Sequence, residues 1–407
     1  HIAEQAVAVG GSVTLASGAT ATLNANGTIT YDPNGKFNHL VSPAKAATTG
    51  ASNSSATDSY TYTLVGGASA GVTVTVNGVD TPNDWLQGTA GNDTMTGTSL
   101  ADIFMLQDGG EDGASGGLGN DGFYLGAALS AGDRLDGGTG TDQVGLQGGY
   151  GTAGTPYVFD AANFSNIEML VLLPGNDARF GDGAGNNYNY FLKTVDANVA
   201  SGEQLAVSFN TLRVGENVSF DGSAETDGSF LTFGGLGNDT LIGGQQNDAF
   251  YFGFNRWGAG DSVDGQGGSL DQLGLQGVYT GANAIAFGAN QLAGIEMLVL
   301  LSGGDARFGS GGAPYSYNII TNDANVASGA TFWVSANTLR ADETLIFDGS
   351  AETDGRFVAY GGQGADVIIG GAGADEIWGR GGADTLGGNA GTDRFVYTAV
   401  TDSTAVS

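Results

Sequence analysis

Apolar and polar residues alternate through the first 82 residues of the chain. The alternation predicts six short strands, near 5–9 and at 12–15, 21–23, 28–31, 60–64 and 72–76. Turn-forming pairs such as Asn26-Gly27 and Asn77-Gly78 follow several of these segments. Short strands at this spacing are typical of an antiparallel β-sandwich, so we expect a small one, complete or partial, over residues 1–82. Residues 36–56 are rich in Ser, Thr and Ala and predict a loop. The turn-rich segment 81–84 predicts a hinge.

Beyond the hinge the apolar residues follow a period of nine. Four units run without a break over 361–396, each with paired or near-paired glycines, then an aspartate, then an apolar residue two places later. These apolar residues are Ile368, Ile377, Leu386 and Phe395. Less regular units occupy 88–105, 116–124 and 234–251. The pattern predicts glycine-rich turns between very short inward-facing strands, with two units to a coil, so that residues eighteen apart stack.

The chain also contains a second repeat, with a much longer period than the nonapeptides. The sequences IEMLVLL, DARFG, DANVASG, NTLR and FDGSAETDG each occur twice, 127 or 128 residues apart. We therefore predict a first repeat block over 83–130 and two solenoid modules over 131–257 and 258–407. The expected fold class is all-β: a parallel β-roll or β-helix solenoid of nonapeptides and spacer rungs, preceded by the small antiparallel sandwich.

The amino-acid composition limits the kinds of binding and catalytic site that the chain can form. The 407 residues include 74 Gly, 33 Asp, 10 Glu and 12 Lys or Arg, for a net charge of −31. This balance excludes a basic nucleic-acid surface. With no Cys and two His, a cysteine nucleophile and a His-rich zinc site are excluded. The longest apolar runs are far too short to span a membrane as a helix.

The nonapeptides have the composition of a site for a hard cation. Glycine permits positive φ and close backbone approach, while aspartate and turn carbonyls supply oxygen. Carboxylates stacked on successive coils repel one another unless a cation lies between them, and Ca²⁺ accepts six or more oxygens in loose geometry. We expect several Ca²⁺ ions. The candidate ligands are Asp93, Asp102, Asp121, Asp133, Asp136, Asp142, Asp239, Asp248, Asp261, Asp264, Asp271, Asp366, Asp375, Asp384 and Asp393.

The nonapeptides resemble those of RTX (repeat-in-toxin) exoproteins of bacteria. The resemblance implies a parallel β-roll, calcium in the turns, type I secretion, and folding after export into calcium-rich medium. The segments LNANGTITYDPNG and VTVTVNGV resemble the latter part of bacterial cadherin-like (VCBS-type) repeats of surface adhesins. The segment from Asp393 to Thr404 resembles the stretch that follows the last repeat in many RTX exoproteins.

Catalytic interpretations are weaker. Ser69 and Ser115 each lie in a GxSxG string, but that motif needs a strand–turn–helix context and a His base, for which only His39 is available. Acidic pairs at Glu225/Asp227 and Glu352/Asp354 occur identically in both modules, which favours a turn or a differently built calcium site. We expect no enzyme. We expect surface ion pairs between Asp177 and Arg179 and between Asp305 and Arg307. We expect the tryptophans to pack against other side chains more than to bind carbohydrate; these are Trp257, Trp333 and Trp378.

These observations predict a secreted calcium-binding structural protein of the bacterial cell surface or extracellular matrix, as an S-layer, adhesin or fibre. We expect self-association into a lattice or filament, with surface polysaccharide as a further candidate partner, and no nucleic acid or transmembrane segment. The alternative is the non-catalytic calcium-binding carrier portion of an exoenzyme such as a protease, lipase or polysaccharide-modifying enzyme. Because the chain starts at His1, we expect a processed product or a fragment.

Overall fold

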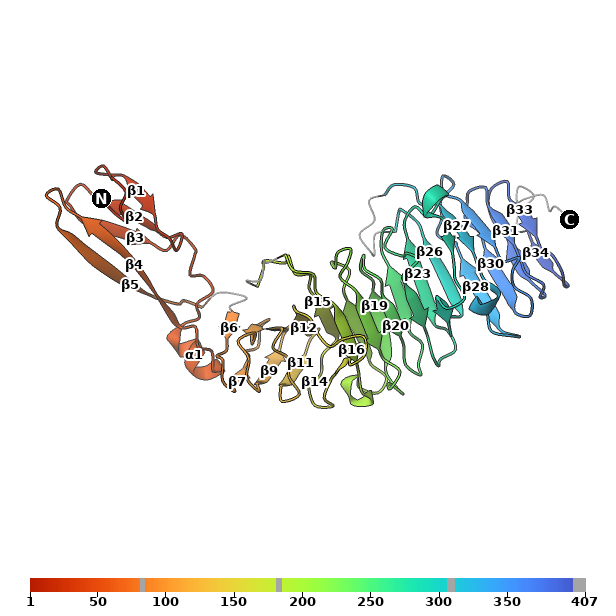
Figure 1. Cartoon of the computed structure of the whole chain (residues 1–407), viewed down its shortest axis with the longest axis horizontal. Coiled ribbons are helices and arrows are strands. Elements are labelled where there is room, and N and C mark those ends of the chain that lie inside the picture. Colours follow the sequence, from red (N-terminus) through yellow and green to blue (C-terminus); the bar gives the residue numbers. More distant parts are fainter. Residues whose placement is uncertain (81–84, 181–184, 306–311, 398–407) are drawn as a thin grey trace. The chain divides into compact units, whose positions relative to one another are not determined.

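The computed structural model describes residues 1–80, 85–180, 185–305 and 312–397, and these are mainly β (Figure 1). They divide into two compact units, one comprising 1–144 with 164–167 and the other 145–163 with 168–407. The hinge predicted at 81–84, Arg307, and most of the stretch after the last repeat lie outside the described residues. Among the described residues, no helix is long and apolar enough to cross a membrane.

Unit 1 begins with two small antiparallel sheets, as the alternating pattern predicted. The strands are β1 (Ser12–Thr14), β2 (Thr20–Leu23) and β3 (Ile29–Asp32) in one sheet, and β4 (Ser55–Thr63) and β5 (Ser69–Asn77) in the other. A cluster that includes Ile2, Val13, Leu15 and Tyr60 is buried between them. Strand pairing and this shared core confirm five of the six predicted strands.

Two local predictions for this region were wrong. The sixth strand, near 5–9, is absent: Ala3 and Glu4 take positive φ and turn the chain, and Gln5 forms only an isolated bridge with Ile2. A short helix, α1 (Pro43–Thr49), lies in the segment that the composition indicated as a loop. The helix is stabilised by the residues that cap its two ends. The Ser42 side chain accepts from the backbone N–H of Lys45 at the N-terminal end, and Gly50 ends the helix with a φ of 81°.

The rest of unit 1 consists of parallel coils with a strand on each of two sheets. One sheet contains β6 (Trp85–Gln87), β8 (Ile103–Met105) and β10 (Gly122–Gly126), and β12 (Gln143–Leu146) follows at the unit boundary. The other contains β7 (Thr94–Thr96), β9 (Gly113–Leu118), β11 (Arg134–Thr139) and β14 (Phe164–Ser165). The apolar residue of each nonapeptide, such as Met95 or Phe104, is buried between the sheets.

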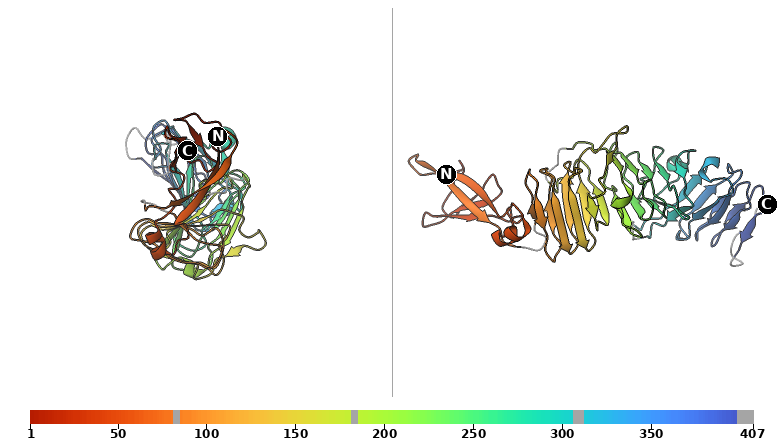
Figure 2. Two further views of the ribbon diagram at one scale, coloured as in Figure 1. Left: turned by 90° about the vertical axis from the view of Figure 1, so that its left-hand side faces the viewer. Right: turned by 90° about the horizontal axis from the view of Figure 1, so that it is seen from below.

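Unit 2 repeats this arrangement over more coils (Figures 1 and 2). Its longest run of parallel strands is β15 (Met169–Leu172), β17 (Gln204–Ser208), β19 (Ser229–Phe233), β21 (Ala249–Phe252), β23 (Gln272–Gln276), β26 (Met297–Leu301), β28 (Thr331–Ser335), β30 (Arg356–Tyr360), β32 (Glu376–Trp378) and β34 (Arg394–Val396).

The facing strands of unit 2 form two shorter sheets. The first has β13 (Tyr157–Val158), β16 (Tyr190–Lys193), β18 (Val218–Asp221), β20 (Thr240–Ile242), β22 (Ser262–Asp264) and β25 (Leu292–Ala293). The second has β24 (Ile285–Ala286), β27 (Tyr317–Ile320), β29 (Leu345–Asp348), β31 (Val367–Ile369) and β33 (Thr385–Gly387). Short 3₁₀ turns lie in the spacers: η1 (Asp196–Asn198), η2 (Gly281–Asn283) and η4 (Asp323–Asn325).

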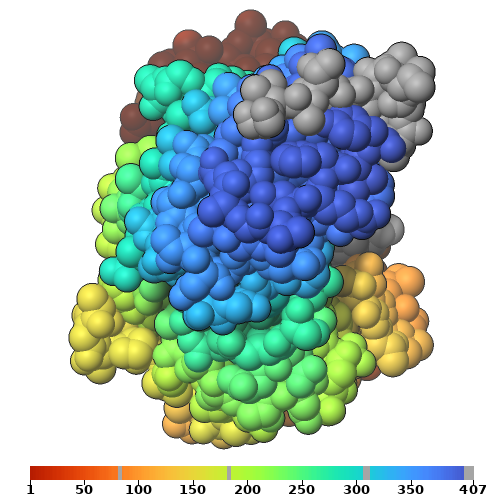
Figure 3. Space-filling view, turned by 90° about the vertical axis from the view of Figure 1, so that its right-hand side faces the viewer, coloured from red at the N-terminus to blue at the C-terminus, as the bar shows by residue number. Residues whose placement is uncertain are grey.

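Register within the last coils confirms the predicted stacking of residues eighteen apart. Ile368 pairs with Leu386 on one sheet, and Ile377 pairs with Phe395 on the other. Figure 3 shows these coils at the C-terminal end of unit 2. The core lies between the sheets, where facing rings pack edge to face, as Phe347 does against Phe357 at 5.1 Å.

Candidate calcium-binding turns

The turns between strands hold the aspartates of successive coils in register. The backbone N–H of Asp366 donates to Oδ1 of Asp384 at 2.9 Å, and that of Asp375 donates to Oδ1 of Asp393 at 3.0 Å. Each carboxylate thus caps the equivalent N–H on the coil before it. We call a run of carboxylates linked in this way an aspartate ladder. The predicted stacking of Asp366 on Asp384 and of Asp375 on Asp393 is confirmed.

The second carboxylate oxygen folds back onto its own turn. Oδ2 of Asp366 accepts from the N–H of Gly362, and Oδ2 of Asp375 from that of Gly371, both at 2.7 Å. In the less regular units a threonine takes the glycine's place, as where Thr98 donates its N–H to Asp102 at 2.6 Å. Each aspartate therefore closes its own turn and anchors the preceding one.

Glycine is required where one turn passes over the backbone of another. Gly382 and Gly391 adopt φ of 112° and 118°, and a Cβ there would lie 2.0–2.1 Å from the carbonyl oxygens of Gly364 and Gly373. These separations are far below van der Waals contact, so any side chain would push the coils apart. The glycine of the motif thus sets the coil spacing on which the ladders depend.

The ladders contain most of the predicted ligands. In unit 1 they are Asp93, Asp112 and Asp133 on one side and Asp102, Asp121 and Asp142 on the other. In unit 2 they are Asp239 with Asp261; Asp248, Asp271 and Glu296; Asp366 with Asp384; and Asp375 with Asp393. Asp136 and Asp264 lie instead at strand positions, where they accept from Asn166 and Gln266.

Two ladder residues were missed in the sequence. Asp112 follows Gly109-Gly110-Glu111, a shortened unit whose paired glycines before an aspartate were the available signal. Glu296 ends one ladder by accepting from the N–H of Asp271 at 2.8 Å. Nothing in the local sequence indicates that role, because Glu296 directly precedes the spacer strand β26 and follows a single glycine, Gly294, in place of a glycine-rich turn.

Burial and mutual repulsion raise the pKa of several buried ladder carboxyls. Burial raises the pKa of Asp239 to about 7, helped by the charge of Asp261, and that of Asp271 to about 7, helped by Asp248. The same two causes raise the pKa of Asp366 to about 6. Asp121 follows the pattern, with a pKa raised to about 6, and its buried Oδ2 has no hydrogen-bond partner. Crowded, desolvated carboxylates of this kind are stabilised by a bound cation.

A lysine side chain of the protein forms an ion pair with one of the ladder carboxylates. The ammonium of Lys45, on α1, lies 3.2 Å from Oδ1 of Asp102, which is 1% exposed. Asp102 is the first carboxylate of its ladder, so it has no earlier aspartate N–H to cap. The lysine therefore supplies positive charge at this end of the ladder.

The ladders offer only oxygen ligands, as Ca²⁺ sites require, in rows that repeat from coil to coil. Ser69 begins β5 and Ser115 lies within β9, so neither GxSxG serine is at a strand-to-helix turn. Trp257 is buried against Phe252 and Phe287, and Trp378 packs on Tyr360. Arg179 and Asp177 form the predicted surface ion pair at 2.6 Å.

Comparison with protein families identifies the repeats. The model of the RTX calcium-binding nonapeptide repeat matches four copies, over 83–104, 233–255 and 360–395. The chain therefore carries RTX calcium-binding repeats, and they form a parallel β-roll with stacked aspartates. RTX repeats bind calcium, and RTX repeat proteins are typically secreted. No curated protein and no solved structure matches the chain significantly, and nothing supports the cadherin-like resemblance of the N-terminal segment.

Protons should partly replace calcium in the metal-free protein. The carboxyls of Asp239, Asp271 and Asp366 have an ordinary pKa of 3.8 when unfolded and about 6 to 7 when folded, so the folded state binds more protons between these limits. The free energy of unfolding should then be highest below about pH 4 and fall as pH rises through about 7. The β-sheet circular dichroism signal of calcium-stripped protein between pH 4 and 8 measures this. A signal that rises with pH would contradict it, whereas the stability of calcium-saturated protein, where protons compete with the metal, should rise with pH.

Proposed function

We propose that the protein is a secreted structural protein of the bacterial surface or extracellular matrix, which folds on calcium after export and has no catalytic activity of its own. The observation that carries this proposal is the repetition itself. Coils with the same aspartate turns recur in both units, and two modules repeat the same spacers 127 or 128 residues apart. Repetition of this kind extends a surface without creating one distinctive pocket.

Self-association is the second part of the proposal, and the N-terminal sheets support it. Among the described residues, β5 pairs only with β4, so its outer edge keeps backbone groups available for another strand. Leu64 and Val65, at the turn of this hairpin, are exposed. An open strand edge beside exposed apolar residues favours strand addition from a second copy. If the contacting surfaces differ, the contact propagates as a filament or sheet.

We expect the 407-residue protein to form polymers in millimolar calcium that light scattering and sizing detect. Replacing Thr73 and Thr75, both exposed on β5, with Lys should shift the population to monomers, because charge on an edge strand opposes pairing. The matched control replaces the exposed Thr152 and Thr155 of unit 2 with Lys and should leave the polymers intact. A wild-type protein that stays monomeric at high concentration would overturn the assembly proposal.

A further inference from the structure

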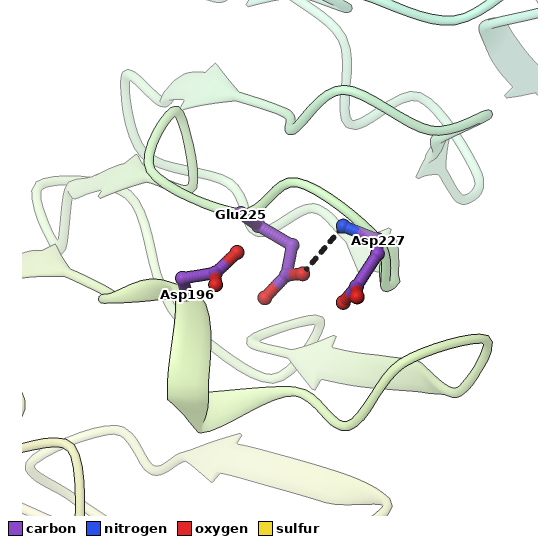
Figure 4. A group of neighbouring side chains, drawn as sticks. All are labelled: Asp196, Glu225 and Asp227. Atoms are coloured by element: carbon purple, nitrogen blue, oxygen red, sulfur yellow. Dashed lines mark hydrogen bonds between the residues drawn. The ribbon is translucent and has the colours of Figure 1, made fainter.

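Three acidic side chains of unit 2 meet outside the aspartate ladders. Asp196 comes from η1, and Glu225 and Asp227 come from the turn between β18 and β19 (Figure 4). One carboxylate oxygen from each lies within 4.8 Å of the others. Asp196 and Asp227 are exposed, whereas Glu225 is fully buried. The turn therefore presents a buried carboxylate flanked by two that reach solvent.

The buried glutamate is only half satisfied by the protein. Its Oε1 accepts from the backbone N–H groups of Thr226, Asp227 and Gly228 at 2.7–3.1 Å. Its Oε2 is buried and has no hydrogen-bond partner. Figure 4 shows the Glu225 carboxylate between the other two side chains. A buried carboxylate oxygen with no donor, facing two further negative charges, is costly unless a cation is present.

The hydrogen bonds of Asp196 and Glu225 recur in the second module, although among the described residues only the first-module carboxylates all lie within 4.8 Å of one another. Glu352 is 1% exposed, its Oε1 accepts from the N–H groups of Asp354 and Gly355, and its Oε2 again has no partner. Asp323 accepts from the N–H and hydroxyl of Thr353, as Asp196 does from Thr226. Two independent copies of the loop thus leave the same oxygen without a donor.

Each module also contains a buried glutamate that is paired with an arginine of the protein, and this pair serves as a comparison. Nine residues before Glu225, Glu216 is also fully buried, but it pairs with Arg213 at 2.8 Å and also accepts from the N–H groups of Gly175 and Tyr188. In the second module Glu343 pairs with Arg340 at 3.2 Å. Among the described residues, neither Glu225 nor Glu352 forms an ion pair, and the charged groups that meet Glu225 in its cluster are aspartates.

The position of the cluster relates it to the repeats. The carbonyl of Glu225 accepts from the N–H of Gln245, in the turn of the nonapeptide that contains Asp248. The carbonyl of Glu352 accepts in the same way from Ala372, in the turn that contains Asp375. In both modules the acidic cluster therefore lies one coil before a nonapeptide turn, where the spacer changes into the repeat.

We propose that Asp196, Glu225 and Asp227, and their copies Asp323, Glu352 and Asp354, form a second kind of calcium site that begins the row of nonapeptide sites in each module. Three carboxylates and no nitrogen or sulfur favour a hard divalent cation, and two exposed ligands leave room for the waters that Ca²⁺ accepts. Such a solvent-accessible site should bind at about 10⁻⁴ to 10⁻³ M, as in extracellular calcium modules.

Counting bound calcium on the full chain tests the site. Equilibrium dialysis at millimolar calcium should show one ion fewer for each module when Asp227 and Asp354 are both changed to Asn, because each change removes an exposed ligand and leaves the buried core untouched. The matched control is Glu203→Gln, which removes an exposed charge from the neighbouring turn outside the cluster. An unchanged count in the Asn variant, or an equal loss in the control, would overturn the proposed site.

A second variant keeps the test valid if the Asn protein folds poorly. Glu225→Gln with Glu352→Gln retains an oxygen for the backbone donors and removes the buried charges. In calcium-free buffer this variant should retain more β-sheet circular dichroism signal than the wild type, and in calcium its advantage should disappear as the wild type gains the ion. A variant that retains less signal than the wild type in calcium-free buffer would contradict the proposal. Absence of any calcium binding by the wild type would instead contradict the function proposed above.

Discussion

At neutral pH, calcium-stripped protein is expected to lose most of its β-sheet circular dichroism signal and to regain it cooperatively as calcium is added. The chain carries a net charge of −31, and its ladders place carboxylates on adjacent coils, so the metal-free fold repels itself. An ion that binds only the folded state stabilises it by about 2.7 kcal/mol at a concentration one hundred times its Kd. Several such sites together match the whole stability of an ordinary domain, which is roughly 5–15 kcal/mol.

The control separates binding from screening. Sodium chloride at matched ionic strength screens surface charge without filling an oxygen cage, and Mg²⁺ demands a stricter octahedral geometry than Ca²⁺. Neither should restore the signal at the concentration at which calcium does. A spectrum that stays unchanged in EGTA, or a salt that restores it as well as calcium, would show that the ladders fold without the metal.

Asp375→Ala should cost far more calcium affinity and stability than Asp102→Ala. The Asp375 carboxylate accepts from the N–H groups of Phe357 and Gly371, both at 2.7 Å. Its loss therefore removes a ligand and leaves two buried N–H donors without an acceptor. Each unsatisfied donor lowers the free energy of unfolding by about 1–3 kcal/mol. Asp102 caps only its own turn at Thr98, and its other oxygen pairs with Lys45. Calcium titrations followed by circular dichroism should therefore show a large shift of the midpoint for Asp375→Ala and a small one for Asp102→Ala.

Asp375→Asn is the informative companion. The amide oxygen can still accept one of the two backbone hydrogen bonds, but the charge that a cation requires is gone. We expect Asp375→Asn to lose calcium as Asp375→Ala does, and to be the more stable of the two in calcium-free buffer. Equal calcium loss in Asp375→Ala and Asp102→Ala would show that the register of the last four nonapeptides does not set affinity.

The nonapeptide turns were predictable to the residue where their period is unbroken. The predicted inward positions Ile368, Ile377 and Leu386 are fully buried, because a nine-residue repeat places the same residue at the same point of each half-coil. The fourth, Phe395, lies on the last described strand and is half-buried. At the N-terminus the alternating pattern predicted five strands correctly. It failed near 5–9, where two residues with positive φ turn the chain, and it missed α1, which depends on its caps and not on apolar periodicity.

By itself the sequence determined the strand type, the calcium-binding turns and the stacking of residues eighteen apart, because each depends on a pattern that repeats locally. Only the tertiary structure decided which coils meet where spacers intervene. Val358 pairs with Glu376, eighteen residues on, but Met297 pairs with Trp333, thirty-six residues on. Spacer length therefore does not reveal the register, which follows from how the apolar strands pack between the sheets. The contact of Lys45 with Asp102, the capping by Glu296 and the meeting of Asp196 with Glu225 all follow from that packing.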